Sequence, residues 1–225
     1  PLWCVHPVAA GDAIELGFAT RGCRAYLGVA DGFTADAQFD STATVVREAL
    51  GGLNGNGQPL AAGDILPCAR VTARQHLQLA PEQQPRYANQ LTVRVIPGYQ
   101  RRLFSRLEKR RFFGARYTVS ERSDRMGYRL EGAPVACATE GIISEGICHG
   151  AIQVPPDGNP IVLLNDRQTI GGYPKIGAAL SLDTARLAQL TAGATVHFAP
   201  VTRATATRAL DLAARFTLNK PLRQY

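Results

Sequence analysis

Hydrophobic residues fall in short runs along this chain, and turns containing Gly, Pro or Asn separate the runs. Residues 91–96 alternate apolar and polar positions, as in a strand with one buried face. Residues 161–164 are continuously apolar, which is typical of a strand covered on both faces. We predict strands at residues 13–17, 23–29, 91–96, 117–120, 151–154, 160–165 and 195–201. Many short strands favour a closed barrel or a sandwich over an open α/β sheet.

Helix signals are few and lie near the end of the chain. Asp183 is suited to be the N-cap of a short helix that contains Leu187 and ends before Gly193. Residues 204–216 place apolar side chains, including Phe216, at helical spacing, which predicts a closing helix that packs over the barrel. The expected fold class is therefore mainly β, with a few short helices.

Length and composition narrow the classes of protein. The 225 residues, 45% hydrophobic and 19% charged, suit a globular chain of one large or two small domains and exclude collagen, coiled coil and disorder. The polar segment 75–90 is the best boundary, so we divide the chain into residues 1–85 and 86–225. No apolar run is long enough for a membrane span, and the start of the chain lacks the pattern of an export signal. Five cysteines without a C-x-x-C pair favour the reducing cytoplasm.

Positive charge is concentrated in the middle of the chain. Residues 86–129 hold twelve Arg or Lys residues and three acidic residues, interleaved with Phe104, Phe112 and Phe113. This pattern is compatible with a nucleic-acid surface or an acidic protein partner. The alternative is a solvated loop or short helix whose aromatic side chains pack inward, and we favour it because Arg is abundant along the whole chain. We expect neither a nucleic-acid partner nor a membrane partner.

Candidate chemistry gathers between residues 117 and 174. Asp124 and Arg125 are adjacent and would face apart on a strand, so each needs another partner. A guanidinium is suited to bind a carboxylate or phosphate through two hydrogen bonds, although it also fixes loops through backbone carbonyls. Polar residues at 144–145 precede a strand with small neighbours, and residues 164–174 place polar groups before a Gly-Gly turn, as at a pocket rim.

The common catalytic devices are absent from the sequence. It has no G-x-S-x-G elbow, no G-x-x-x-x-G-K-[ST] phosphate loop and no dinucleotide fingerprint. Cys148 and His149 are adjacent, and neighbouring strand residues face apart, which argues against a thiol–imidazole dyad. The histidine spacing supports no metal site.

Three segments together resemble one family closely: SDRMGYRLEG, ISEGICHGAIQVPPDGNPIVLLNDRQTIGGYP and DTARLAQLTAG with the strand after it. The family is that of the 5-oxoprolinase C subunit, also called KipA or allophanate hydrolase subunit 2, which is related to the carboxyltransferase domain of urea carboxylase. A weaker resemblance continues upstream in AGDAIELGFATRGCRAYLGVADG and LAAGDIL. The resemblance implies cyclophilin-like β-barrels. Residues 1–85 would form a first barrel, incomplete and divergent, and residues 86–225 a second barrel with the C-terminal helix.

The resemblance also implies a function. Family members work with a B subunit of similar fold and a separate A subunit in the ATP-dependent opening of 5-oxoproline, a small cyclic amide, to glutamate. ATP would serve the assembled complex and need not bind this chain. Related domains transfer a carboxyl group from carboxybiotin to urea, so biotin belongs to that alternative. A further alternative is a Kip-type module that regulates a kinase inhibitor by protein contact.

The first part of the chain departs from the family. The N-terminal motifs of the family are missing, which suggests a fragment. Asp31 stands where the family usually has Gly, residues 40–44 (DSTAT) replace G-S-R-S-T, and Gln58 replaces an Arg after Gly57. The second part therefore carries the expected site.

We assign roles to ten residues of that second part. Arg125 would bind an anionic substrate group, and Asp166 would orient or deprotonate the substrate. Gln168, Thr169 and the Gly171–Gly172 amides would bind the substrate carbonyl or a developing oxyanion. The predicted catalytic residues are Arg125, Asp166, Gln168 and Thr169, and the predicted substrate-binding residues are Ser144, Glu145, Gln153, Gly171, Gly172 and Tyr173.

Overall fold

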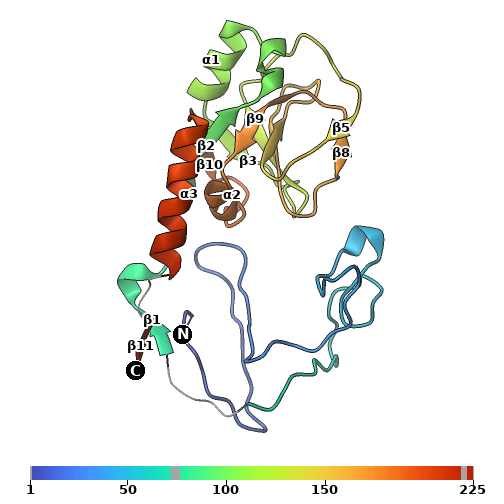
Figure 1. Cartoon of the computed structure of the whole chain (residues 1–225), viewed down its shortest axis with the longest axis vertical. Coiled ribbons are helices and arrows are strands. Elements are labelled where there is room, and N and C mark those ends of the chain that lie inside the picture. Colours follow the sequence, from blue (N-terminus) through green and yellow to red (C-terminus); the bar gives the residue numbers. More distant parts are fainter. Residues whose placement is uncertain (1, 72–76, 219–221, 225) are drawn as a thin grey trace. The chain divides into compact units, whose positions relative to one another are not determined.

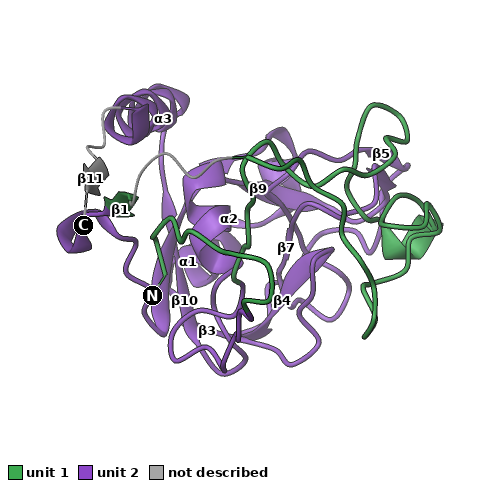
Figure 2. Ribbon diagram, turned by 90° about the horizontal axis from the view of Figure 1, so that it is seen from below, with its two compact units in different colours: residues 1–12, 25–78, 223–225 green, residues 13–24, 79–222 purple. Residues whose placement is uncertain are grey.

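Strands from residues 90–200 close into a barrel (Figure 1). The computed structural model describes residues 2–71, 77–218 and 222–224. The chain divides into two compact units, one of residues 1–12, 25–78 and 223–225 and the other of residues 13–24 and 79–222, and the second unit contains the barrel (Figure 2). The division at residue 86 and a first barrel over residues 1–85 stay predictions.

The described elements follow one another in short lengths. The strands are β1 (Leu77–Leu79), β2 (Gln90–Pro97), β3 (Tyr117–Val119), β4 (Gly127–Gly132), β5 (Glu145–Gly146), β6 (Ala151–Gln153), β7 (Ile161–Leu163), β8 (Ile170–Gly171), β9 (Lys175–Ala179), β10 (Thr195–Pro200) and β11 (Leu222–Gln224). The α-helices are α1 (Arg106–Gly114), α2 (Ser181–Leu187) and α3 (Arg203–Leu218), and the 3-10 helices are η1 (Val46–Glu48), η2 (Pro81–Gln83) and η3 (Tyr99–Leu103). The predicted mainly β fold class is confirmed.

The barrel strands run in the order β10-β2-β9-β6-β7-β4-β3, and β3 pairs with β10 to close the ring. β2 and β10 are parallel, with Leu91 opposite Val196 and Val93 opposite Phe198, whereas the other neighbours are antiparallel. Small separate sheets join β5 to β8 and β1 to β11. The β5–β8 pair matters for the site because it stands outside the barrel ring.

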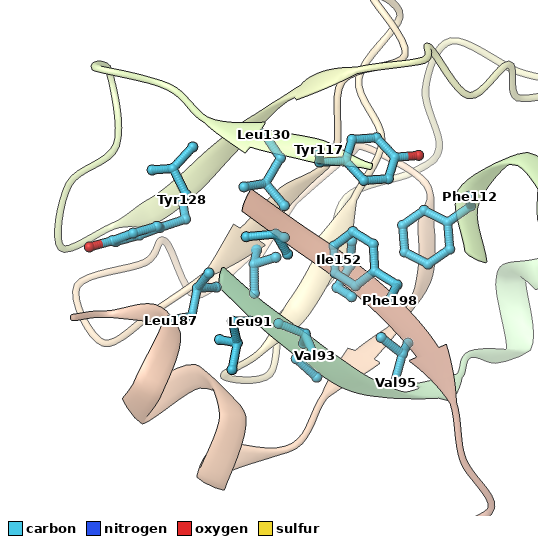
Figure 3. Close-up of a cluster of buried hydrophobic side chains, with 14 of the residues drawn as sticks. Leu91, Val93, Val95, Phe112, Tyr117, Tyr128, Leu130, Ile152, Leu187 and Phe198 are labelled. Carbon is cyan, nitrogen blue, oxygen red and sulfur yellow. The ribbon is translucent and has the colours of Figure 1, made fainter. Parts of the chain in front are cut away.

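The barrel interior is filled by the inward residues of the strands (Figure 3). Leu91, Val93 and Val95 of β2 are buried, as their alternation predicts. Helix α1 contributes Phe112, whose ring stacks on Phe198 of β10 with centroids 4.3 Å apart. Ser105 is the N-cap of α1, and its Oγ accepts from the backbone N–H of Glu108.

We expect Phe112→Leu to lower the free energy of unfolding by about 1–2 kcal/mol. Phe112 is fully buried, so the change removes the stacked ring contact with Phe198 and leaves a small void. The exposed Phe18 gives the matched control, and Phe18→Leu should shift stability by less than about 0.5 kcal/mol. Urea unfolding followed by circular dichroism measures both. Equal effects of the two changes would contradict this account of the core.

Helix α2 begins differently from the prediction. Its N-cap is Leu180, and Asp183 lies inside the first turn, so the prediction of Asp183 as N-cap was wrong. The Asp183 carboxylate instead binds Arg94 of β2: it accepts from the backbone N–H at 2.8 Å and from Nε and Nη2 at 2.8 and 2.7 Å. The carboxylate is nearly fully buried by this contact, which joins α2 to the barrel wall.

Helix α3 forms where residues 204–216 predicted a helix, but it does not pack as expected. Ala206 is its one buried residue, and the exposed residues include Leu210, Leu212 and Leu218. The prediction that this helix covers the barrel was therefore wrong. Its apolar positions have the right spacing, yet spacing does not specify the surface that a helix meets.

Among the residues that the structure describes, no helix has both the length and the apolar character to cross a membrane.

The strands predicted at residues 13–17 and 23–29 do not form. Ile14, Leu16 and Phe18 are exposed, so their alternation has no covered face to stabilise a strand. At the second segment, the backbone N–H groups of Cys23 and Arg24 both donate to Oε1 of Gln189, at 3.0 and 2.9 Å. A side chain therefore takes the hydrogen bonds that a neighbouring strand would have taken.

Two aspartates of the first unit have unusual backbone geometry. Asp31 and Asp40 adopt φ of +60° and +59°. This left-handed region suits Gly, and Asp tolerates it better than most residues. Besides its part of the β1–β11 pair, the described part of the first unit holds η1 and isolated bridges such as Phe33 with Cys68. The two aspartates thus adopt a backbone conformation that Gly takes most readily.

Candidate functional site

A pocket of about 400 Å³ lies on the outer face of the barrel wall, and we call it the outer-wall pocket. β4, β7 and β6 each contribute to it, together with the turns that flank them. Its apolar lining is Met126, Pro155, Pro156, Ile161 and Leu163, with Gly127 between them, and its polar lining is Asp124, Arg129, Gln153, Asp157, Gln168 and Tyr173. This size and mixture suit a small polar ligand.

The alternation of β7 explains why the pocket lies outside the barrel. Val162 points into the main core, whereas Ile161 and Leu163 belong to a second apolar cluster with Ile147 and Ala151. β7 is thus buried on both faces, as its continuous apolar run predicts. On β4, Gly127 lies opposite Leu163, and a Cβ at this glycine would come within 3.2 Å of that side chain. The missing side chain lets Ile161 and Leu163 pack closely against β4.

Gln153 brings a buried amide to the pocket. Its side chain is 1% exposed, and Gln168 Nε2 donates to its Oε1 over 3.5 Å. Gln153 Nε2 has no hydrogen-bond partner in the described part of the chain. Gly171 approaches this nitrogen closely, since a Cβ at position 171 would lie 2.9 Å from it. The sequence predictions for Gln153, Gln168 and Gly171 therefore meet at one place in the structure.

Next to Gln153, a charged residue that the sequence analysis missed lies on β9. Lys175 is the register partner of Gln153, so their side chains share one face of the wall. The Lys175 ammonium pairs with Glu145 Oε1 at 2.5 Å, and Gln100 Nε2 donates to the same oxygen at 2.7 Å. The Tyr99 hydroxyl donates to Oε2. We call these four residues, Lys175, Glu145, Gln100 and Tyr99, the Glu145 network.

The Glu145 network keeps its carboxylate charged. The Lys175 ammonium, and after it the Tyr99 hydroxyl, lowers the pKa of Glu145 below its ordinary value of 4.5. The same hydrogen bond to Glu145 raises the pKa of Tyr99. Gln100 Oε1 also accepts from the backbone N–H of Lys175 at 2.7 Å, which fixes η3 to β9. A buried cation is thus held beside Gln153 by a carboxylate that stays ionised at neutral pH.

Arg125 and Asp166 meet, as their roles at one site require, but they bind each other. Arg125 Nε and Nη2 donate to the two Asp166 oxygens at 2.7 and 3.1 Å. Arg125 precedes β4 and Asp166 follows β7, and the antiparallel pairing of these strands brings the two loops together. The Arg125 side chain is 58% exposed, and neither residue is in the pocket lining. Their roles toward a substrate stay predictions.

The other predicted residues lie along the β5–β8 pair. The Thr169 and Gly172 carbonyl oxygens accept from the backbone N–H groups of Ile147 and Ile142. The Ser144 side chain is exposed, and its Oγ would lie 3.4 Å from a Cβ at Gly172. Tyr173 lines the outer-wall pocket. Of the ten predicted site residues, the structure places Gln153, Gln168 and Tyr173 in the pocket lining, Gly171 against Gln153, and Glu145 in the neighbouring network.

The missed residues leave different traces in the sequence. Lys175 is one of three lysines in a chain with 22 arginines, and it directly follows the predicted GGYP segment. In general, the pKa of an ammonium group shifts more readily than that of a guanidinium. A rare Lys in an Arg-rich chain can therefore indicate a functional position. Gln100 and Tyr99 carry no such signal, because they are separated from Lys175 by more than 70 residues.

In the basic stretch, the aromatic side chains pack inward and the arginines face solvent. α1 and η3 expose Arg102, Arg106 and Arg110, while Phe104 and Phe112 are buried.

The described histidine and cysteine side chains give no sign of a metal site. His149 has a pKa lowered by burial and, after that, by the charge of Arg167. The residues that the model describes contain no cluster of three or more His, Cys, Asp or Glu side chains placed to hold a metal ion.

Comparisons with known proteins cover most of the chain. The model of the family "Carboxyltransferase domain, subdomain A and B" matches residues 1–200. The 5-oxoprolinase C subunit of Escherichia coli (strain K12) is 35% identical over 193 residues, which are 85% of this chain and 61% of that protein. A putative urea carboxylase of Emericella nidulans is 29% identical over 213 residues, or 88% of this chain and 17% of that protein.

Solved structures agree on the fold. The crystal structure of the Kluyveromyces lactis urea carboxylase superposes with a TM-score of 0.75 at 22% identity, covering 90% of this chain and 20% of that one. The chain spans about three fifths of the length of the E. coli relative. The chain belongs to the family of carboxyltransferase domains, subdomains A and B.

Proposed function

We propose that this chain serves as the C subunit of an ATP-dependent 5-oxoprolinase, which opens 5-oxo-L-proline to L-glutamate together with its A and B subunits. The observation that carries the proposal is the 35% identity to a 5-oxoprolinase C subunit over 193 residues. The outer-wall pocket supports it, because about 400 Å³ accommodates a five-membered lactam. Opening the ring adds one water across the amide C–N bond, which yields the γ-carboxylate and the amine of glutamate.

The proposal assigns roles to residues around the pocket. We assign substrate binding to Gln168, which lines the pocket, while the Lys175–Glu145 ion pair lies on the same wall outside the lining. In the sequence, Arg125 directly precedes the lining residue Met126, and Asp166 lies two residues before the lining residue Gln168. We propose that Arg125 exchanges Asp166 for the substrate carboxylate, with Thr169 at the adjoining turn.

ATP is assigned to the assembled complex. ATP need not bind this chain, which carries no phosphate-loop motif. Cys4, Cys23, Cys68, Cys137 and Cys148 are all free thiols, which supports a reducing, cytoplasmic setting for the assembly.

Glutamate formation from 5-oxoproline and ATP tests the proposal. We expect a mixture of this chain with its cognate A and B subunits to form glutamate, and the mixture without the chain to form none. Arg125→Ala should abolish the activity while leaving the fold intact, because an exposed ion pair contributes less than about 1 kcal/mol to stability. The exposed Arg122 gives the control, and Arg122→Ala should be active. No glutamate from the complete mixture would overturn the proposal.

A second candidate is carboxyl transfer to urea from carboxybiotin. The 29% identity to a putative urea carboxylase favours it. The same mixture, supplied in addition with urea and carboxybiotin, distinguishes the two candidates. Urea-dependent consumption of carboxybiotin without glutamate formation would support the second candidate.

A further inference from the structure

We propose that the Gln153 side-chain amide selects the ligand of the outer-wall pocket by donating from Nε2 to a neutral carbonyl oxygen of a small amide. The assignment deepens the proposed function, and it rests on that function for the choice of 5-oxoproline as a ligand. It makes Gln153 the specificity-determining residue of the pocket.

The first support is an unpaired donor in a buried place. Gln153 is 1% exposed, and its Nε2 has no partner among the residues that the model describes. A buried donor without an acceptor costs free energy, and native proteins seldom keep one. Because Gln153 also lines the pocket, an acceptor atom of a bound ligand would satisfy it.

The second support is the fixed orientation of the amide. Gln168 Nε2 donates to Gln153 Oε1 over 3.5 Å, whereas Nε2 has no partner among the described residues and is the end left for the ligand. Gly171 has no side chain at the point where a Cβ would lie 2.9 Å from that nitrogen. A larger residue there would crowd the amide, so the glycine lets β8 lie close to the donor without displacing it.

The surroundings favour a neutral carbonyl over a carboxylate. Ile161 faces Gln153 across β6 and β7, and Ile147 also lies against Gly171. A carboxylate buried beside Gln153 needs a cation, and the neighbouring Lys175 ammonium is already paired with Glu145. Arg129, the cation of the pocket lining, is separated from Gln153 by Ile161. A lactam carbonyl needs one neutral donor, which is what Gln153 offers.

Binding to the full chain tests the assignment by titration calorimetry. The probes are 2-pyrrolidinone, which has the ring carbonyl alone, and 5-oxoproline and proline, which share ring and carboxylate and differ at that carbonyl. We expect Gln153→Leu to lower the affinity for both 2-pyrrolidinone and 5-oxoproline at least tenfold. The weak binding of proline should stay unchanged. Gln90, exposed at the start of β2, gives the matched control, and Gln90→Leu should bind all three like the wild type.

A stability readout separates this role from a structural one. Gln153→Leu removes an unsatisfied buried donor, so its Tm should equal or exceed that of the wild type. If this variant does not fold, the side-chain amide resonances of Gln153 in the wild type give the answer: they should shift when 2-pyrrolidinone is added. Unshifted resonances, or wild-type affinity in the folded variant, overturn the assignment.

The test of the 5-oxoprolinase proposal is independent of the test of the Gln153 assignment. A reconstituted complex that opens 5-oxoproline with an unchanged KM when it carries Gln153→Leu overturns the role of Gln153 and leaves the 5-oxoprolinase proposal standing. A complex without activity, whose chain still binds 2-pyrrolidinone through Gln153, overturns the 5-oxoprolinase proposal and supports the assignment.

Discussion

Asp183→Ala is expected to lower the free energy of unfolding by about 3 kcal/mol. The Asp183 carboxylate is nearly fully buried and accepts three hydrogen bonds from Arg94, one from its backbone and two from its guanidinium. Removal of one partner from such a buried pair leaves the other without its counter-ion and leaves a backbone N–H unpaired. The Arg94 side chain stays partly open to water, which keeps the loss below the upper end of the usual range.

Urea unfolding at neutral pH measures the effect. Asp183→Asn should lower the free energy of unfolding less than Asp183→Ala does, because an amide oxygen can still accept from the Arg94 backbone N–H. Asp211, exposed on α3, gives a control in which Asp211→Ala changes stability by less than about 0.5 kcal/mol. An Asp183→Ala chain as stable as the wild type would show that α2 is held to the barrel by its apolar contacts alone.

Glu145→Gln is expected to lower the free energy of unfolding by about 2 kcal/mol at pH 7. It should also remove part of the loss of stability that the wild type shows in acid. The change leaves the buried Lys175 ammonium with a neutral partner. Because Lys175 and then Tyr99 lower the pKa of Glu145, this carboxylate stabilises the fold above its ordinary value of 4.5, and the stabilisation disappears as pH falls through the lower folded-state pKa.

Unfolding measured at pH 7 and between pH 5 and 3 tests this expectation. The wild type should lose stability faster than Glu145→Gln over the acidic range, so the two chains converge. Glu121, exposed and distant from the network, supplies Glu121→Gln as the control that keeps the acid slope of the wild type. A constant difference between wild type and Glu145→Gln across pH would exclude the ion pair as its source.

Local patterns in the sequence located the barrel strands β2, β3, β6, β7 and β10, whereas β4 was not predicted. The alternation of Leu91, Val93 and Val95 predicted β2 within one residue at each end, and the run at 160–165 located β7. β9 escaped prediction because KIGAA holds small residues of low strand propensity, which the barrel forces into a strand. Helix α3 was located, but the surface it meets depends on contacts that periodicity does not encode.

The site was predictable only as far as its residues cluster in sequence. Gln153, Gln168, Gly171 and Tyr173 lie within one segment, and the resemblance to a family covers it. Gln100 reaches Lys175 and Glu145 from η3, and only the pairing of β2 with β9 brings it there. The binding of Arg125 by Asp166 also needed the β4–β7 register. Charge pairing between distant loops is a property of topology, not of spacing.

The parallel pairing of β2 with β10 has a consequence for synthesis on the ribosome. Gln90 lies beside Thr195, and β10 also supplies the partner of β3, so one late strand fills the gap between two early ones. Until β10 has emerged, β2 and β3 both present open edges with unpaired backbone groups. Such long-range closure slows folding and exposes nascent chains to aggregation. A chain that stops before residue 195 should therefore accumulate in inclusion bodies, however complete its pocket.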